Sequence, residues 1–172
     1  MSQGILRDVG RARKPLRRTG ARAALVGVIS DTHGLLRPEA AAALRGCDAI
    51  VHAGDIGKAQ VLDELRAIAP LTVIRGNVDK WADDLPDTEV LALGGRHFYV
   101  IHDVHDLDLD PQAAGFDAVI SGHSHQPSIS YREGVLYLNP GSAGPRRFRL
   151  PIALARIRVT ADALQPAIVT LA

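Results

Sequence analysis

The first half of this chain alternates short apolar runs with helical segments, and this alternation constrains its fold more than any other feature. Residues 23–30, 47–55 and 71–77 are mostly apolar, as in strands that are covered on both faces. Residues 38–45 and 59–69, which lie between those runs, have the alanine content and the apolar spacing of helices. The alternation therefore predicts parallel β-α-β units.

The second half of the chain is richer in hairpins. Residues 89–103 predict two strands joined at Gly94-Gly95, and residues 127–141 predict a hairpin that turns at Glu133-Gly134. Further short strands are expected at 117–125, 152–159 and 166–171. Together the two halves predict an α/β fold with two sheets, the first of them rich in parallel strands.

Basic residues are concentrated at the N-terminus, although the whole chain has a net charge of only +1. Residues 1–22 contain seven Arg and Lys residues and one acidic residue, whereas the rest of the chain has a net charge of −5. We interpret residues 1–22 as a flexible basic arm and residues 23–172 as the folded domain. The arm could contact nucleic acid, but it lacks the aromatic residues that stack on bases, so a solvated extension is favoured.

Several classes of protein are excluded by what the sequence lacks. The single cysteine, Cys47, cannot form an intramolecular disulfide or a thiolate zinc cage. No apolar run approaches the roughly 20 residues that cross a membrane, and the N-terminus has no apolar secretory signal. We therefore expect a cytoplasmic protein that has no membrane partner.

Metal-binding side chains follow five of the predicted strands. Because ligands bind at the carboxyl ends of strands in open α/β sheets, these side chains are expected to gather along one edge. They comprise two carboxylates, one amide and four imidazoles, from Asp31, His33, Asp55, Asn77, His102, His123 and His125.

Seven such groups exceed the needs of one divalent ion, whereas two ions that share a carboxylate would use all of them. Mixed carboxylate and imidazole ligands suit Mn, Fe, Co, Ni or Zn rather than Ca or Mg. In "DTH" (31–33) and "HSH" (123–125) the two ligands are two residues apart. An extended backbone would project both members of each pair to the same side.

The ordered motifs resemble those of the calcineurin-like metallophosphoesterase superfamily. Within it, the segments "VISDTHG", "VHAGDI", "VIRGNVD", "SGHSHQP" and "LNPGS" resemble the small bacterial and archaeal phosphodiesterases, whose relatives include the vacuolar-sorting retromer subunit. The resemblance covers residues 24–172. It implies a four-layer αββα sandwich, in which two mixed β-sheets are flanked by helices.

The resemblance also implies a dinuclear metal centre, most simply with two Mn²⁺ ions, although Ni²⁺, Fe²⁺, Co²⁺ and Zn²⁺ are also open. Asp55 would bridge the two ions and would act in catalysis with Asn77, His102 and His123. The first ion would be held by Asp31, His33, Asp55 and His125, and the second by Asp55, Asn77, His102 and His123. The implied reaction is hydrolysis of a small phosphodiester by a metal-bound hydroxide.

Two positions depart from the family pattern. Val78 follows Asn77, where many related phosphatases have a histidine that assists the leaving group, so substrates with good leaving groups are favoured. Asp103 follows His102, where the family usually has glycine. We interpret Asp103, with the nearby His105, as a partner of the metal ligands or as a proton donor.

Other residues keep more than one interpretation. His52 is expected to be a hydrogen-bonded core histidine, and Asp79 either anchors the loop after Asn77 or caps a turn. The segment from Asn139 to Ser142 is explained by turn formation alone. A solvated basic face is favoured over phosphate binding for three arginines, Arg146, Arg147 and Arg149.

Three functions other than phosphodiester hydrolysis remain open: a non-catalytic interaction protein on the same fold, a nuclease guided by the basic arm, and a phosphomonoesterase. The presence of all seven ligands argues against the interaction protein. Homo-oligomers are common in the family, so a homo-oligomer is a further possibility.

Overall fold

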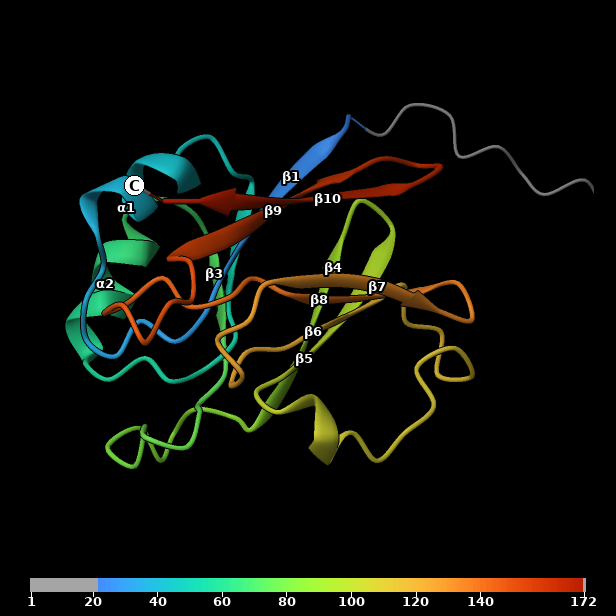
Figure 1. The fold of residues 1–172 in the computed structure, drawn as a ribbon. Coiled ribbons are helices and arrows are strands. Elements are labelled where there is room, and N and C mark those ends of the chain that lie inside the picture. The colour runs from blue at the N-terminus through green and yellow to red at the C-terminus, as the bar shows by residue number, and fades with distance from the viewer. Residues whose placement is uncertain (1–21, 172) are drawn as a thin grey trace, which may run out of the picture.

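A computed structural model of the chain describes residues 22–171 (Figure 1). The predicted basic arm, apart from Arg22, lies outside the described residues. In chain order the elements are β1 (Ala24–Ile29), α1 (Pro38–Leu44), β2 (Ala49–His52), α2 (Ala59–Arg66), β3 (Leu71–Val73), β4 (Thr88–Leu93), β5 (Arg96–Ile101), the 3₁₀ turn η1 (Val104–Asp106), β6 (Ala118–Ile120), β7 (Ser128–Arg132), β8 (Val135–Asn139), β9 (Ala153–Val159) and β10 (Leu164–Thr170).

The strands form two five-stranded sheets, and both are mixed. The first has the order β10-β9-β1-β2-β3, and the second has the order β4-β5-β6-β8-β7. In the first sheet β1, β2 and β3 run parallel, and in the second sheet β5, β6 and β8 run parallel. The remaining pairs are antiparallel. The predicted α/β fold with two mixed sheets is confirmed.

Both predicted hairpins turn at the expected residues. Gly94 and Gly95, between β4 and β5, have φ angles of 59° and 76°. Glu133 and Gly134, between β7 and β8, have φ angles of 50° and 81°. Two central residues with positive φ are typical of a type I′ turn, whose twist matches that of the flanking strands.

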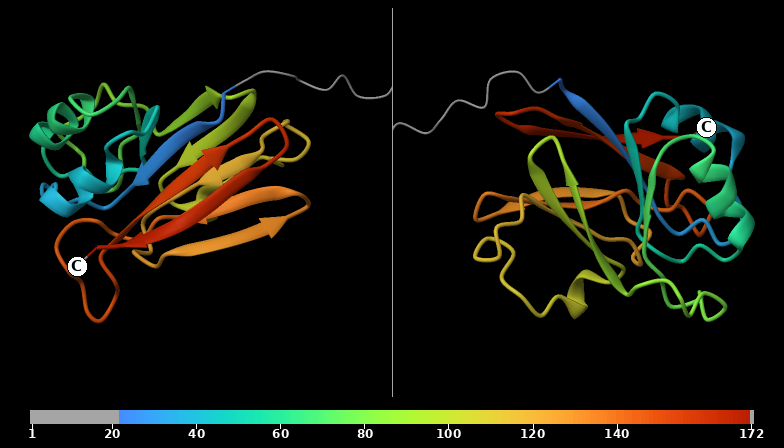
Figure 2. Two further views of the ribbon diagram at one scale, coloured as in Figure 1. Left: turned by 90° about the horizontal axis from the view of Figure 1, so that it is seen from above. Right: turned by 180° about the vertical axis from the view of Figure 1, so that it is seen from behind.

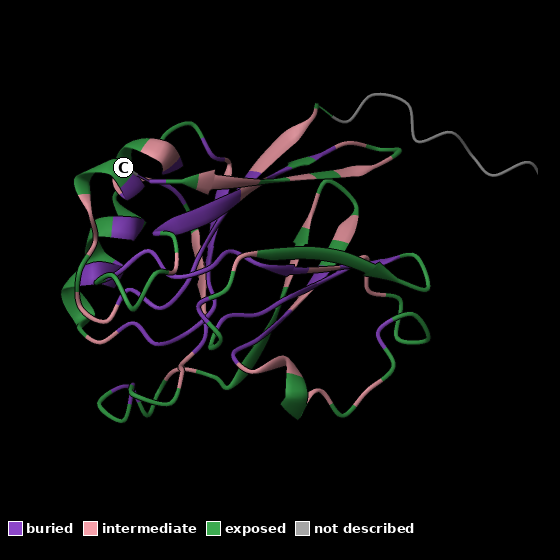
Figure 3. Ribbon diagram, viewed as in Figure 1, coloured by how far each residue is buried: buried purple, intermediate pink, exposed green. Residues whose placement is uncertain are grey.

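An aliphatic core fills the space between the two sheets (Figure 3). Val26, Val28 and Val51 of the first sheet pack there with Phe98 and Val100 of the second sheet, and all five side chains are fully buried. Phe98 is among the largest of the fully buried side chains. The dry contact between the sheets therefore depends strongly on it.

The outer faces of the two sheets are covered differently (Figure 2). Helices α1 and α2 place Leu44 and Leu65 against Ile50 of the first sheet. On the second sheet, Val104 and Leu107, in and after η1, pack against the strands. A 3₁₀ turn and a loop thus take the place of an α-helix in the fourth layer. None of the helices among residues 22–171 is both long and apolar enough to span a membrane.

The carboxyl ends of the six parallel strands meet at one edge of the sandwich. The Asp31 N–H donates to the carbonyl of Gly54 at 3.0 Å and joins the loops after β1 and β2. The Ala143 N–H donates to the carbonyl of Ser30 at 3.1 Å and joins the loop after β8, in the second sheet, to the loop after β1. Loops from both sheets are therefore fixed to one another.

Asp79 fastens the loop after β3 to the loop after β2. Its fully buried carboxylate accepts hydrogen bonds from the backbone N–H groups of Ile56 at 3.0 Å, Gly57 at 2.8 Å and Gly76 at 2.8 Å. Of the two interpretations left open for Asp79, the structure supports the loop anchor.

His52 makes a second buried connection between loops. The Gly54 N–H donates to its Nδ1 at 3.2 Å, so Nε2 carries the proton and donates to the Thr32 hydroxyl at 2.9 Å. Thr32 in turn donates to the carbonyl of Ile56 at 3.0 Å. Full burial lowers the pKa of His52 to about 4 and keeps the ring neutral. The expectation of a hydrogen-bonded core histidine is confirmed.

Replacing Phe98 with alanine should lower the free energy of unfolding by about 3–5 kcal/mol, because a cavity would open between the sheets. Phe148→Ala is the matched control, since that side chain is 93% exposed. We expect it to change stability by less than about 0.5 kcal/mol. Urea unfolding of both variants measures the difference, and equal stabilities would contradict this account of the core.

The stability of the metal-free protein should fall as the pH decreases from about 6.5 towards about 4. In this range His52 is neutral when folded but gains a proton when unfolded, so acid favours the unfolded chain. The loss attributable to His52 is about 3 kcal/mol. Urea unfolding at several pH values should give a steeper pH dependence for the wild type than for His52→Gln. The exposed-site control His97→Gln should keep the wild-type slope.

Candidate metal centre

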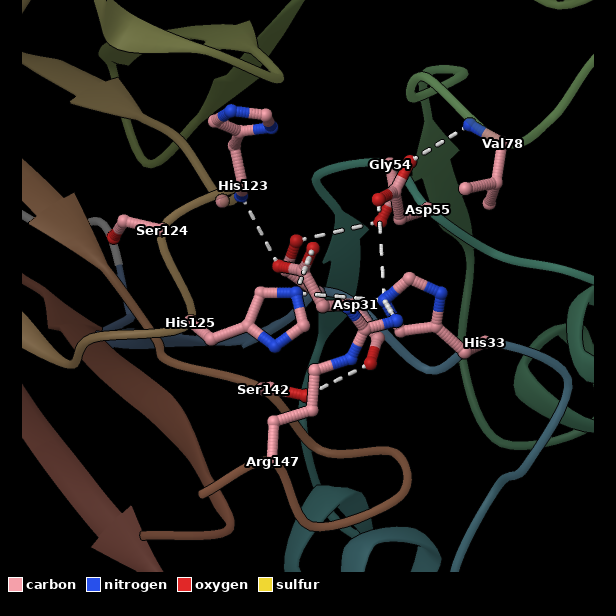
Figure 4. Close-up of polar contacts among 12 residues, drawn as sticks. Asp31, His33, Gly54, Asp55, Val78, His123, Ser124, His125, Ser142 and Arg147 are labelled. Carbon is pink, nitrogen blue, oxygen red and sulfur yellow. Dashed lines mark hydrogen bonds and ion pairs between the residues drawn. The ribbon is translucent and has the colours of Figure 1, made fainter. Parts of the chain in front are cut away.

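Three of the predicted ligands form a tight cluster at the edge where the loops meet (Figure 4). The Nε2 atom of His125 lies 3.2 Å from Oδ1 of Asp31 and 3.4 Å from Nε2 of His33. Asp31 is fully buried, His125 is 7% exposed, and His33 is partly buried. The three donor atoms can therefore face one common ion.

Asp55 lies between this cluster and His102. Its Oδ2 atom is 3.9 Å from Nε2 of His33, and its Oδ1 atom is 3.4 Å from Nε2 of His102. Donor atoms of Asp31, Asp55 and His102 all lie within 4.8 Å of one another. Asp31 thus belongs to both groups of ligands, and Asp55 directs one oxygen to each side. We call these five residues, Asp31, His33, Asp55, His102 and His125, the candidate metal centre.

The two remaining predicted ligands lie at the margin of the centre. Asn77 is exposed and lines a cleft that also contains His102. The His123 side chain is 46% exposed, and Figure 4 shows its ring directed away from His125. Its Nε2 atom lies 3.6 Å from Oδ2 of Asp103, and its ring meets that of His102 edge to face with 5.3 Å between the centroids.

Asp103, which stands where the family usually has glycine, is the partner of two histidines. Besides facing His123, it accepts hydrogen bonds from the backbone N–H of His105 at 3.0 Å and from Nδ1 of His105 at 2.8 Å. Partial burial raises the pKa of Asp103, but these hydrogen bonds outweigh it and the net shift is downward. Asp103 therefore stays ionised and orients both rings.

Most of the predicted ligands occupy left-handed backbone. The φ angles are 54° at Asp31, 45° at His33, 56° at Asp55, 67° at His123 and 60° at His125. Such values are uncommon for residues other than glycine and are strained unless the surroundings hold them. The expectation that "DTH" and "HSH" are extended is therefore wrong. Tight turns at the strand ends aim these side chains.

Glycines beside the ligands allow the loops to approach closely. A Cβ atom on Gly76 would overlap the Asp55 carboxylate, and one on Gly122 would overlap the Ser30 hydroxyl. These two loops come from different sheets, so only a residue without a side chain lets both reach the centre. The Gly122 contact also allows the His123 N–H to donate to Oδ2 of Asp31 at 3.2 Å.

Asp55 and His102 each stabilise the charged form of the other. Burial raises the pKa of Asp55, but His102 and the Val78 N–H outweigh it and lower that pKa to about 2. Burial also lowers the pKa of His102, yet the adjacent Asp55 carboxylate gives a net upward shift. Burial lowers the pKa of His33. The Asp55 carboxylate opposes this shift, whereas the positive Arg147 adds to it.

Buried polar atoms that make no hydrogen bond are what a metal site requires, and among the described residues the centre contains such atoms. Nδ1 of His102 donates to the carbonyl of Ala53 at 2.7 Å, which leaves Nε2 as the free lone pair. Buried Nε2 of His102 and Oδ1 of Asp31 have no hydrogen-bond partner among the described residues. Donors that surround one tetrahedral ion are about 3.4 Å apart, close to the separations in the Asp31 cluster.

Three further residues, which the sequence alone did not assign to the site, contact its loops or its ligands. The Asn139 side-chain amide donates to the carbonyl of Gly122 at 2.7 Å, and the Ser142 hydroxyl donates to the carbonyl of Asp31 at 2.9 Å. Nη2 of Arg147 lies 3.5 Å from Nε2 of His33 (Figure 4). The position of "LNPGS" directly after a parallel strand is the signal that could have identified the first two.

The chain is similar in sequence to known metallophosphoesterases. The chain is 34% identical over 158 residues to a probable metallophosphoesterase of Methanothermobacter thermautotrophicus, covering 84% of this chain and 91% of that protein. It is 25% identical over 137 residues to a phosphodiesterase of Methanocaldococcus jannaschii, covering 67% of this chain and 82% of that protein.

Among solved structures, vacuolar protein sorting 29 from Cryptosporidium parvum has the same fold. The TM-score is 0.70 at 16% identity, with 87% of this chain and 98% of that chain covered. Residues 25–162, most of the chain, match the calcineurin-like phosphoesterase superfamily domain. The chain therefore belongs to the calcineurin-like phosphoesterase superfamily.

Proposed function

We propose that this protein is a metal-dependent phosphodiesterase that holds two divalent ions, most simply Mn²⁺. One observation carries the proposal: the buried Asp55 carboxylate directs one oxygen towards His33 and the other towards His102. A carboxylate between two sets of imidazoles is what a pair of ions sharing one ligand requires. The similarity to an archaeal phosphodiesterase supports the same conclusion.

Each ion has its own set of ligands in this proposal, and Asp55 is common to both. Asn77 and His123, which lie at the margin of the candidate metal centre, would complete the second set. The first ion takes Asp31, His33, Asp55 and His125, and the second takes Asp55, Asn77, His102 and His123. Asp31, which lies near both groups, adds negative charge between them.

Bound divalent ions supply a Lewis acid for the phosphoryl group and lower the pKa of a coordinated water. The residues of the chain supply the rest. Asp31 and Asp55 offset the charge of the ions, and Asp103 stays ionised beside His123 and His105. Because Asp103 has no proton to give, His105 is the better candidate to protonate a leaving group.

Arg147 gives the centre a cationic flank on the side of His33. Its guanidinium is exposed and lies 3.5 Å from Nε2 of that histidine. A phosphate placed over the centre would come within reach of its N–H donors, which match two phosphate oxygens in geometry. The favoured interpretation of Arg147 as part of a solvated face is thus replaced in this proposal by a phosphate contact.

The hydrolysis of bis(4-nitrophenyl) phosphate by metal-stripped protein, with Mn²⁺, Ni²⁺, Zn²⁺ or Mg²⁺ added back, tests the proposed activity. We expect turnover only with a transition metal, and a loss of at least about a hundredfold in Asp55→Ala. Asp63→Ala, at an exposed position on α2, is the control and should keep full activity.

Turnover without any added metal, or wild-type turnover by a folded Asp55→Ala variant, would contradict the proposal. A parallel assay with 4-nitrophenyl phosphate separates a diesterase from a monoesterase. Faster hydrolysis of the monoester would assign the protein to the second class.

Arg147→Ala should lower kcat/KM for the diester about tenfold, chiefly by raising KM, because a charge-assisted contact to the phosphate is lost. Arg147→Lys should recover part of this loss, since the charge remains but the planar pair of donors does not. Arg45→Ala, an exposed arginine at the end of α1, provides the charge-matched control. An Arg147→Ala enzyme with unchanged KM would show that Arg147 belongs to a solvated surface.

A further inference from the structure

A cleft of about 510 Å³ adjoins the candidate metal centre on the side of His102. Asn77 and His102 form the wall that the cleft shares with the centre. The rest of the lining is rich in acid, and we call the cavity the acidic cleft; its carboxylates come from Asp87, Asp103, Asp106 and Asp108. Its volume suits one arm of a small organic substrate.

The negative charge of the acidic cleft is only partly compensated. Its one guanidinium, from Arg75, is paired with the Asp87 carboxylate through contacts of 2.5 Å and 3.1 Å. Asp103 is paired with His105. Within residues 22–171, the exposed carboxylates of Asp106 and Asp108 have no hydrogen bond or ion pair. Two exposed carboxylates are therefore left to meet a positively charged group.

The spacing of these acids favours an organic cation over a metal ion. Within the described part of the chain, Asp87, Asp103, Asp106 and Asp108 contribute to no cluster of donor atoms close enough to hold an ion. Tyr99 and Ile101 also line the cleft. Carboxylates beside an aromatic and an aliphatic residue suit a substituted ammonium group, which is both charged and partly apolar.

His102 belongs both to the lining of the acidic cleft and to the candidate metal centre. His102 is 93% buried, and its Nε2 atom has no hydrogen-bond partner among the described residues. A phosphorus atom held near His102 could therefore extend one of its ester arms into the acidic cleft. Arg147 lies beside His33, which belongs to the first set of ligands, whereas His102 belongs to the second. The two flanks of the centre thus carry opposite charge.

We propose that the acidic cleft binds a cationic ester arm, so that the substrates are phosphodiesters of amino alcohols. The inference rests on the proposed phosphodiesterase function and narrows its substrate class. Nucleic acid is a poor fit, because its neighbouring phosphates would lie against Asp106 and Asp108.

Two diesters with the same leaving group test the proposal. One is 4-nitrophenyl phosphorylcholine, and the other is 4-nitrophenyl 3,3-dimethylbutyl phosphate, in which carbon replaces the charged nitrogen. In both reactions the oxygen of water bonds to phosphorus and the bond from phosphorus to the nitrophenyl oxygen breaks. The products are 4-nitrophenolate, the phosphomonoester of the other arm and a proton.

The Mn²⁺-loaded protein should favour the choline ester about tenfold in kcat/KM at low ionic strength. Asp106→Asn/Asp108→Asn should bring the ratio of the two kcat/KM values close to one. Asp63→Asn, which removes a remote charge, should preserve the ratio. Equal kcat/KM values in the wild type, or a preference that survives in the double variant, would overturn the proposal.

A binding measurement separates this inference from the proposed activity. In saturation-transfer NMR with metal-free protein, choline should receive signal and 3,3-dimethylbutan-1-ol should not, and the choline signal should disappear in the double variant. Choline binding without turnover of either ester would refute the activity and retain the acidic cleft, whereas no choline binding would refute the cleft. Glycerophosphocholine in solution and phosphatidylcholine vesicles, compared in the same way, distinguish a soluble diester from a lipid headgroup.

Discussion

The Asp55 carboxylate is held between two imidazoles, and much of the architecture serves to keep it there. A buried carboxylate is costly unless it is paired. Here the Val78 N–H donates to Oδ1 at 3.1 Å, and His33 and His102 flank the two oxygens. Gly76 leaves room for this packing, since any side chain at that position would overlap the carboxylate. These contacts come from three loops, those after β1, β3 and β5.

Left-handed backbone at the strand ends is the second constraint. Strained residues of this kind cost about 1–3 kcal/mol each and persist only where the surroundings determine them fully. The surroundings are two sheets whose parallel strands end at one edge, together with Asp79 and His52, which tie the loops to each other. The rigidity of the core between the sheets is thus transmitted to the ligands.

Much of the fold and of the site could be predicted from local pattern. The Gly94-Gly95 and Glu133-Gly134 turns allow positive φ, and alternating apolar runs mark the strands on either side. The convergence of Asp31, His33, Asp55, His102 and His125 follows from one rule, that the carboxyl ends of parallel strands share an edge.

Features that depend on contacts between distant segments could not be predicted in this way. The direction of His123 depends on Asp103, which is twenty residues away in the chain. The roles of Asn139 and Ser142 depend on loops of two sheets meeting. The left-handed turns were missed because spacing alone cannot distinguish them from extended backbone, which also places residues i and i+2 on one side.

The opposite charges on the two flanks of the centre give the site a direction. A phosphodiester would place its phosphate near Arg147 and its cationic arm near Asp106 and Asp108. All of this requires two ions at the strand ends. Equilibrium dialysis against Mn²⁺, with the bound metal counted per chain, tests that claim most directly. The account predicts two ions in the wild type and one in a folded His102→Ala variant. A single ion in the wild type, or two ions retained by the variant, would contradict it.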